Sequence, residues 1–183
     1  MSFHEKELYT YEEYLKISES DRCEFIHGSI FMMGSPSIEH QNVVGNLFFI
    51  LKNYFKDKDC KPFIAPLDVT LVDSSNNKNV VQPDVFVVCD NKNIIDNSYK
   101  GIPTLIIEVV SPSNSSHDYI TKLDLYLRAG VEEYWIINPA NRNAICYRFT
   151  NNTILKVDGY SYEETINCEV FKGLNIALKD AFE

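Results

Sequence analysis

Apolar and polar residues follow one another along this chain in patterns that predict both strands and helices. Three short runs of aliphatic and β-branched residues, at 80–88, 104–110 and 133–138, are typical of strands buried on both faces. Two longer segments, at 38–55 and 117–129, repeat their apolar residues with the period of an α-helix. The second helix lies between the last two strands, which predicts a strand–helix–strand unit.

Further strands are expected on either side of this unit. A strand interrupted by Pro66 is predicted over 63–72, and residues 23–33 have the pattern of a hairpin with a two-residue turn. Residues 144–149 and 153–158 predict a second hairpin, and a short strand and a helical turn are expected at the end of the chain. The predicted order of the core is helix, three strands, helix, strand, with one hairpin before it and another after it.

Two of the buried strands each contain a single acidic residue. Asp84 follows Pro83 in the first strand, and Glu108 lies in the second. An isolated ionised carboxylate in an apolar core costs several kcal/mol or more, so such groups are normally paired, hydrogen-bonded or bound to a metal. If the two strands pair, their carboxylates lie side by side. That arrangement is how a site for a divalent cation is made.

The helix that follows Glu108 contains a lysine on its apolar stripe. Lys122 falls at the edge of the stripe that contains Ile120 and Tyr126, whereas Leu125 is expected to point elsewhere. The link from the strand into this helix is short. We therefore expect the ammonium group of Lys122 to lean over the sheet near Glu108.

Length and composition fit one domain that covers residues 1–183, because 45% of the residues are hydrophobic and no linker interrupts them. The first residues do not resemble a secretory signal, and no run is long or apolar enough to cross a membrane. The five cysteines have no metal-binding spacing, so reduced thiols in a cytoplasmic protein are expected. A net charge of −9 without a basic cluster argues against tight, general binding of DNA, although not against a contact made through a metal.

Taken together and in order, these features resemble the PD-(D/E)XK nuclease superfamily, and more closely the Uma-type family of predicted endonucleases. The resemblance implies a restriction-endonuclease-like α/β fold with a central mixed β-sheet flanked by helices, extended by an N-terminal and a C-terminal β-hairpin. It covers nearly the whole chain and rests on Glu24-x-x-x-Gly28, His40, residues 65–69, Gln82-Pro83-Asp84-Val85, residues 108–113, Lys122-Leu123 with Tyr126, and residues 130–139.

By this resemblance, the protein is expected to be a Mg²⁺-dependent endonuclease that hydrolyses phosphodiester bonds in DNA, with Mn²⁺ as a substitute for Mg²⁺. Asp84, Glu108 and the backbone carbonyl of Val109 are the expected metal ligands. Glu24 is a candidate for a further acid close to the metal. Because superfamily members that cut both strands are often dimers, the resemblance also implies a possible homodimer.

The catalytic lysine departs from the common superfamily pattern. That lysine usually lies two residues after the second acid, where this chain has Val110. In several branches of the superfamily the lysine lies on the following helix instead, and Lys122 occupies the matching place here. A cation there can help to lower the pKa of a metal-bound water and stabilise charge that builds on the phosphate.

Less specific interpretations remain open for these residues. Asp84 follows a proline, which is also typical of a turn at the end of a strand. Glu108 is alternatively the acidic partner in a buried ion pair. Lys122 is alternatively a residue at the edge of the helix whose ammonium group reaches the solvent. Glu24 is alternatively a solvated carboxylate of the hairpin. At the level of function, the alternatives are a catalytically inactive nuclease fold that serves as an interaction or dimerisation module, and the hydrolysis of a small nucleotide.

Overall fold

The computed structural model describes residues 8–72, 76–111 and 116–183, and its centre is a six-stranded mixed sheet. Within this sheet β9 and β10 are parallel, and the other neighbouring strands are antiparallel. From one edge to the other, the strands are β12 (Thr153–Ser161), β11 (Asn143–Thr150), β10 (Glu133–Asn138), β9 (Leu105–Val109), β6 (Val85–Val88) and β3 (Lys61–Ile64).

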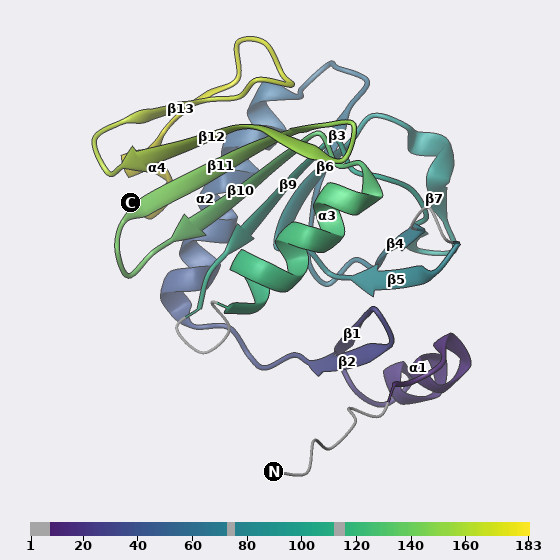
Figure 1. Ribbon diagram of the computed structural model, residues 1–183. Coiled ribbons are helices and arrows are strands. Elements are labelled where there is room, and N and C mark those ends of the chain that lie inside the picture. Colours follow the sequence, from purple (N-terminus) through teal and green to yellow (C-terminus); the bar gives the residue numbers. More distant parts are fainter. Residues whose placement is uncertain (1–7, 73–75, 112–115) are drawn as a thin grey trace.

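A second sheet of six short strands lies beside the central sheet, below it in the view of Figure 1. Its β1 and β2 form a hairpin, and its β4 and β5 form another; β1 pairs with β5. In order, the strands are β2 (Ser29–Met32), β1 (Cys23–Ile26), β5 (Lys78–Val81), β4 (Val69–Val72), β8 (Ser98–Tyr99) and β7 (Ile94–Ile95).

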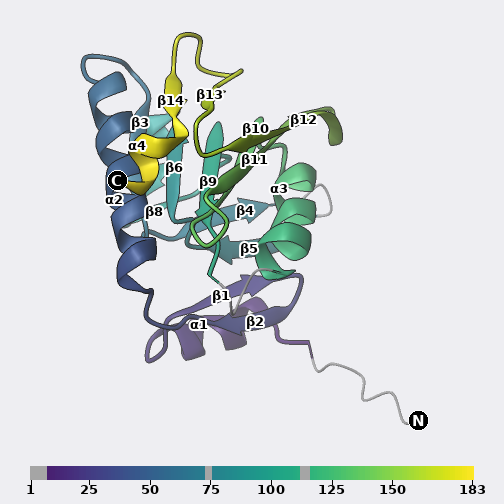
Figure 2. The ribbon, with the colours of Figure 1, turned by 90° about the vertical axis from the view of Figure 1, so that its left-hand side faces the viewer.

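Helices cover both faces of the central sheet. Figure 2 shows α2 (Ile38–Tyr54) on one side and α3 (Leu123–Ala129) on the other. Alternate residues of each central strand contact opposite faces, so Ile107 packs with the α2 side and Ile106 with the α3 side. The remaining elements are α1 (Tyr11–Ser18), η1 (Asn91–Asn93), the π-helix η2 (His117–Lys122), α4 (Leu178–Phe182), and the β13 (Thr165–Asn167) and β14 (Asn175–Ala177) pair.

The strand–helix–strand unit and both hairpins are confirmed. β9 and β10 are the two strands of the unit, η2 and α3 form its helix, and α2 matches the helix expected over 38–55. The first hairpin turns through His27 and Gly28, which both have positive φ, as a two-residue turn requires. The C-terminal hairpin is β11 and β12, and it is continuous with the central sheet through pairing of β10 with β11.

Two predicted strands are each divided between the two sheets. The run 80–88 is not one strand, because β5 ends in the second sheet and β6 begins in the central sheet. The run 63–72 is likewise divided into β3 and β4. Both breaks contain a proline, Pro83 or Pro66, and proline has no backbone N–H to donate within a sheet. Each break lets the chain pass from one sheet to the other.

The expected helical stripe over 117–129 is wrong for two residues. Ile120 is 69% exposed, whereas Leu125 is buried. The reason is that residues 117–122 form a π-helix, whose wider turn changes which side chains share a face before the α-helix begins at Leu123. Gly130 ends the helix in the left-handed conformation, as the sequence indicates.

The expectation of five reduced thiols is wrong for Cys60 and Cys89, which form a disulfide. The two cysteines lie opposite each other at one end of the antiparallel β3–β6 pair. Cys60 directly precedes Lys61, and Cys89 directly follows Val88, the partner of Lys61. Their separation of 29 residues in the sequence gave no sign of this proximity. Cys23, Cys146 and Cys168 are free and buried. Within the described residues, no helix is both long and apolar enough to cross a membrane.

A buried carboxylate, Glu133 of β10, fixes the C-terminal segment against the central sheet. Its Oε1 accepts a hydrogen bond from Trp135 Nε1 at 2.7 Å. Its Oε2 accepts from the backbone N–H groups of Glu169 at 3.0 Å and Val170 at 2.9 Å. Each of these donors loses its partner if the carboxylate is removed.

We expect Glu133→Ala to lower the free energy of unfolding by about 3 kcal/mol, because three buried or part-buried N–H donors, and the thiol of Cys168 at 3.5 Å, lose their acceptor. Unfolding in urea measures this loss. The matched control is Glu132→Ala, since the Glu132 side chain is 56% exposed and contacts only Arg148 across 3.5 Å among the ion pairs of the described residues. Its expected effect is below about 0.5 kcal/mol, and equal losses in the two variants would contradict the assignment.

Candidate active site

Asp84 and Glu108 lie side by side at the boundary between the two sheets. β6 pairs with β9 so that Val85 faces Ile107, which brings the preceding Asp84 opposite Glu108. The Asp84 N–H donates to Glu108 Oε2 at 3.2 Å, and the Val109 N–H donates to Asp84 Oδ2 at 2.8 Å. The juxtaposition expected from the sequence is therefore present.

Lys122 reaches these carboxylates from the helix, as expected. Its side chain is 5% exposed, and its Nζ lies 2.9 Å from Glu108 Oε1. The same ammonium group lies 3.1 Å from Glu24 Oε1 and 3.7 Å from Asp118 Oδ1. We refer to Glu24, Asp84, Glu108 and Asp118 as the carboxylate cluster.

Glu24 is part of this cluster and is not a solvated residue of the hairpin. Its side chain projects from β1 of the second sheet and is 2% exposed. Besides Lys122, it accepts a hydrogen bond from the Gln82 N–H at 2.9 Å, and its Oε2 lies 3.1 Å from His117 Nε2. Glu24 thus joins the second sheet to the helix and to the segment that precedes Asp84.

Two further residues on which the family resemblance rests, Tyr126 and His40, contact the cluster. Tyr126 donates its hydroxyl hydrogen to Glu108 Oε1 at 2.7 Å, which makes it a direct partner of the carboxylate. His40, in the first turn of α2, places its Nε2 3.1 Å from Asp84 Oδ2. His40 and the backbone N–H of Val109 therefore both contact Asp84 Oδ2.

Asp68 is linked to the cluster through Gln82. The Gln82 side chain donates to Asp68 Oδ1 at 2.8 Å and accepts from Arg22 Nε at 2.6 Å. These bonds position the Gln82 backbone, whose N–H binds Glu24. Pro112 and Ser113, which belong to the motif of the resemblance, lie outside the described residues.

Sequence reasoning missed the contacts of His117, Asp118 and Gln82 with this site. Asp118 had a usable signal, because it lies four residues before Lys122 on a predicted helix and such residues are neighbours. His117 and Gln82 had no local signal. Their partner is Glu24, which is more than fifty residues away along the chain from either of them.

The pKa values of Glu24 and Glu108 are shifted in opposite directions. Burial disfavours the charge on Glu24, but Lys122 and the hydrogen bonds from His117 and Gln82 lower the pKa of Glu24 to about 2. Burial raises the pKa of Glu108 well above its usual value, more than Lys122 lowers it, and Asp84 and Asp118 add to the rise. Its surroundings therefore disfavour the ionised form of Glu108, whereas those of Glu24 favour the ionised form.

The pKa values of Lys122 and His40 are both raised, although burial alone would lower them. Burial lowers the pKa of Lys122, but Glu108, Glu24 and Asp118 outweigh it and raise that pKa well above its usual value. Burial also opposes protonation of His40, and the hydrogen bond with Asp84 raises the pKa of His40 nevertheless. The neighbouring carboxylates therefore favour the cationic form of Lys122.

The donor chemistry of the site suits a hard divalent cation. Carboxylate and carbonyl oxygens are the ligands that Mg²⁺ takes in proteins. Several carboxylates share one ammonium group here, and burial together with the neighbouring acids raises the pKa of Glu108. In the described ranges, however, no three Asp, Glu, His or Cys side chains already form a ligand set for a metal.

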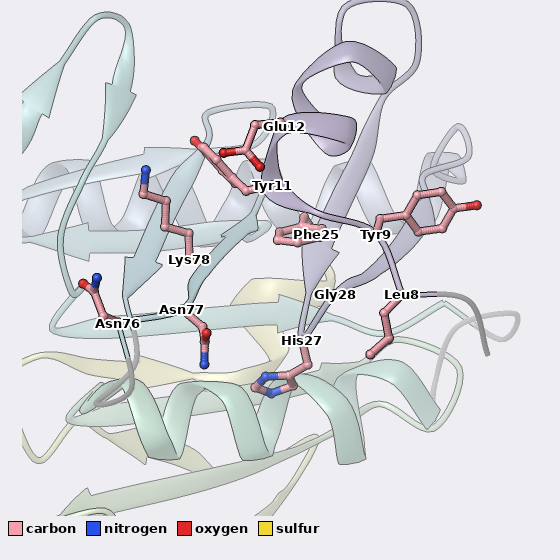
Figure 3. A pocket seen from close by; sticks show the side chains of 10 residues that line it. All are labelled: Leu8, Tyr9, Tyr11, Glu12, Phe25, His27, Gly28, Asn76, Asn77 and Lys78. Carbon is pink, nitrogen blue, oxygen red and sulfur yellow. The ribbon is translucent and has the colours of Figure 1, made fainter. Parts of the chain in front are cut away.

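A cavity of about 560 Å³ is lined in part by residues of the β1–β2 hairpin, and Figure 3 shows its lining. It contains no residue of the cluster. His27 connects it with the helix, because its Nε2 lies 3.8 Å from Asp124 Oδ2 of α3. The lining residues are Leu8, Tyr9, Tyr11, Glu12, Phe25, His27, Gly28, Asn76, Asn77 and Lys78.

Comparison with known proteins identifies the family. A sequence profile named Uma2, described as "Putative restriction endonuclease", matches residues 10–179. The chain belongs to the Uma2 family. Two Synechocystis proteins, both described as uncharacterized, are similar to this Uma2 chain. The protein slr1290 is 32% identical over 151 residues, covering 81% of this chain and 72% of that protein; sll1609 is 28% identical over 144 residues, covering 76% and 77%.

A solved structure shares the fold of this Uma2 protein. It is the crystal structure of a protein from Anabaena variabilis, described as a putative nuclease belonging to DUF820. The two chains match with a TM-score of 0.76 at 20% sequence identity, over 93% of this chain and 96% of the other. The restriction-endonuclease-like fold expected from the resemblance is thereby confirmed.

Asp118 provides a test of the electrostatics of the cluster. Burial, against the effect of Lys122, raises the pKa of Asp118 from 3.8 to about 6. A carboxyl group whose pKa is raised by folding stabilises the protein below its unfolded pKa, and that contribution is lost as the pH rises through its folded pKa. We expect Asp118→Asn to be more stable than wild type by on the order of 2 kcal/mol at neutral pH, with a gain that vanishes near pH 4.

Urea unfolding from acid to neutral pH, with a chelator present, measures this difference. Asp124→Asn is the matched control, because Asp124 is 46% exposed on the same helix and pairs with Arg128. It should show no gain that grows with pH. An Asp118→Asn variant less stable than wild type at neutral pH would contradict the account.

Proposed function

We propose that this protein is a metal-dependent nuclease that hydrolyses phosphodiester bonds in DNA. The observation that carries the proposal is the contact of Lys122 Nζ with Glu108 Oε1 at 2.9 Å. It puts a fixed cation beside the paired acids although Val110 occupies the usual position of the catalytic lysine. Membership of a family described as restriction endonucleases supports the same activity.

In this proposal Asp84, Glu108 and the backbone carbonyl of Val109 hold Mg²⁺, and Mn²⁺ can replace it. The bound ion would supply Lewis-acid polarisation of the scissile phosphate and a water of lowered pKa. Asp84 is oriented for this task by His40 and by the Val109 N–H. Tyr126 fixes Glu108 through its hydroxyl group, so both side chains have defined orientations before a substrate arrives.

Lys122 supplies positive charge beside the attacked phosphate. Because its pKa is raised, it remains protonated at neutral pH, where it can donate hydrogen bonds to the attacking water and to the phosphate oxygens. Glu24 helps to hold the ammonium group in place, because its Oε1 lies 3.1 Å from Lys122 Nζ. We assign Glu24 this positioning role next to the metal ligands.

The acidic character of the chain affects how DNA would be bound. With a net charge of −9, binding must rely on the metal site and a few local contacts and not on a large basic surface. Affinity for uncut DNA without a divalent ion is therefore expected to be weak.

Two variants, one that removes the lysine at position 122 and one that also introduces a lysine at position 110, test the proposal. We expect Lys122→Ala to reduce cleavage of plasmid DNA in Mg²⁺ or Mn²⁺ by about 100-fold or more, because a preorganised charge is lost from the transition state. Val110 packs in the same apolar cluster as Tyr126, on the face that Glu108 shares. Adding Val110→Lys to Lys122→Ala restores a lysine at the usual superfamily position, and we expect it to recover at least about tenfold of the lost rate.

Lys100→Ala is the control, because Lys100 is exposed and pairs only with Asp96 among the ion pairs of the described residues. It should cleave at the wild-type rate, and thermal unfolding confirms that each variant is folded. Wild-type protein that cleaves neither plasmid, single strands nor dinucleotides in either metal would overturn the proposal. That result would favour an inactive nuclease fold that serves as an interaction module.

A further inference from the structure

β12 forms an open edge of the central sheet. In the described part of the chain it pairs with β11 on one side and has no strand on the other. It is 9 residues long, and most of its residues are exposed. A long edge strand presents unpaired backbone N–H and C=O groups that a second strand can bind.

The side chains of β12 make this edge unusually apolar for a solvated surface. Ile154, Leu155 and Val157 are 46%, 65% and 51% exposed, respectively. Only two of the strand's residues are charged: Lys156 and Asp158, on either side of Val157. Within the chain, Lys156 Nζ lies 2.9 Å from Asp158 Oδ2 and 2.9 Å from Glu169 Oε1, and both side chains of the strand remain partly exposed. A second copy of the same strand, running antiparallel, would place apolar residues and opposite charges beside those of the first.

We propose that β12 is a dimerisation surface, on which two copies of this chain pair edge to edge as antiparallel strands centred on Val157. This inference does not rest on the proposed nuclease activity. In antiparallel strands related by a two-fold axis, the central residue lies opposite its own copy. With Val157 at the centre, Lys156 lies opposite Asp158 of the second copy, and this ion pair occurs twice.

The neighbouring registers are unfavourable for electrostatic reasons. A centre at Lys156 places two ammonium groups opposite each other, and a centre at Asp158 places two carboxylates opposite each other. The Val157 register also places Leu155 opposite Gly159 of the second copy. A Cβ added at Gly159 would meet nothing within 4 Å, so there is room at that position for the leucine side chain.

The size of the edge sets the expected strength of association. One strand from each copy makes a small interface, and interfaces below about 1,200 Å² are typical of weak complexes. We therefore expect a dimer that forms in the range of about 1 to 100 μM protein. Its continuous sheet would extend through both copies across the β12 edges.

Sedimentation analysis over that concentration range tests the inference. Wild type should approach twice the mass of one chain, and Val157→Lys should remain a monomer. Lys156→Glu and Asp158→Lys should each raise the dissociation constant about tenfold or more, because each puts like charges opposite one another twice. The double variant Lys156→Glu with Asp158→Lys restores opposite charges and should recover most of the wild-type affinity.

Phe49→Lys is the control, because Phe49 is 68% exposed on α2, away from the edge strand. It should dimerise as wild type does, and circular dichroism confirms that all variants are folded. A wild type that stays monomeric throughout the range overturns the inference. A dimer that survives Val157→Lys, or a double variant no better than the single ones, also overturns it.

Discussion

The buried ammonium group of Lys122 is the interaction on which the rest of this structure depends. Glu24 belongs to the second sheet, Glu108 to the central sheet, and Asp118 to the helix that covers them. All three carboxylates approach Lys122 Nζ within 3.7 Å or less. Removing the lysine would leave these buried carboxylates without the cation that they share, and such a loss commonly costs about 3–5 kcal/mol. The lysine thus joins three parts of the chain.

In the proposed site, the helix supplies the positive charge that the common superfamily pattern places on the strand. The π-helix η2 brings both Asp118 and Lys122 into the interior, and π-helical turns are frequent at functional sites. Tyr126, in the following turn, reaches the same Glu108 oxygen as Lys122. The acids therefore have a cationic neighbour although position 110 is a valine, because Lys122 of the helix contacts Glu108.

The sequence predicted what depends on local patterns and missed what depends on distant partners. The helix over 38–55, the β1–β2 hairpin and the β9–β10 unit follow from periodicity and turn residues, and Glu108 stood out as an acid in an apolar run. The division of 80–88 between two sheets and the Cys60–Cys89 disulfide depend on how sheets assemble. The bonds of Gln82 and His117 to Glu24 likewise become visible only once the hairpin lies against the helix.

The most direct test of the central claim is calorimetric titration of Mn²⁺ into the metal-free protein. If the carboxylate cluster is a cation site that Lys122 compensates only in part, wild type should bind Mn²⁺ with micromolar affinity. Glu108→Ala should lose that binding, whereas Glu132→Ala, which changes an exposed carboxylate, should keep it. No binding by wild type, either alone or with a short DNA duplex, would contradict the account.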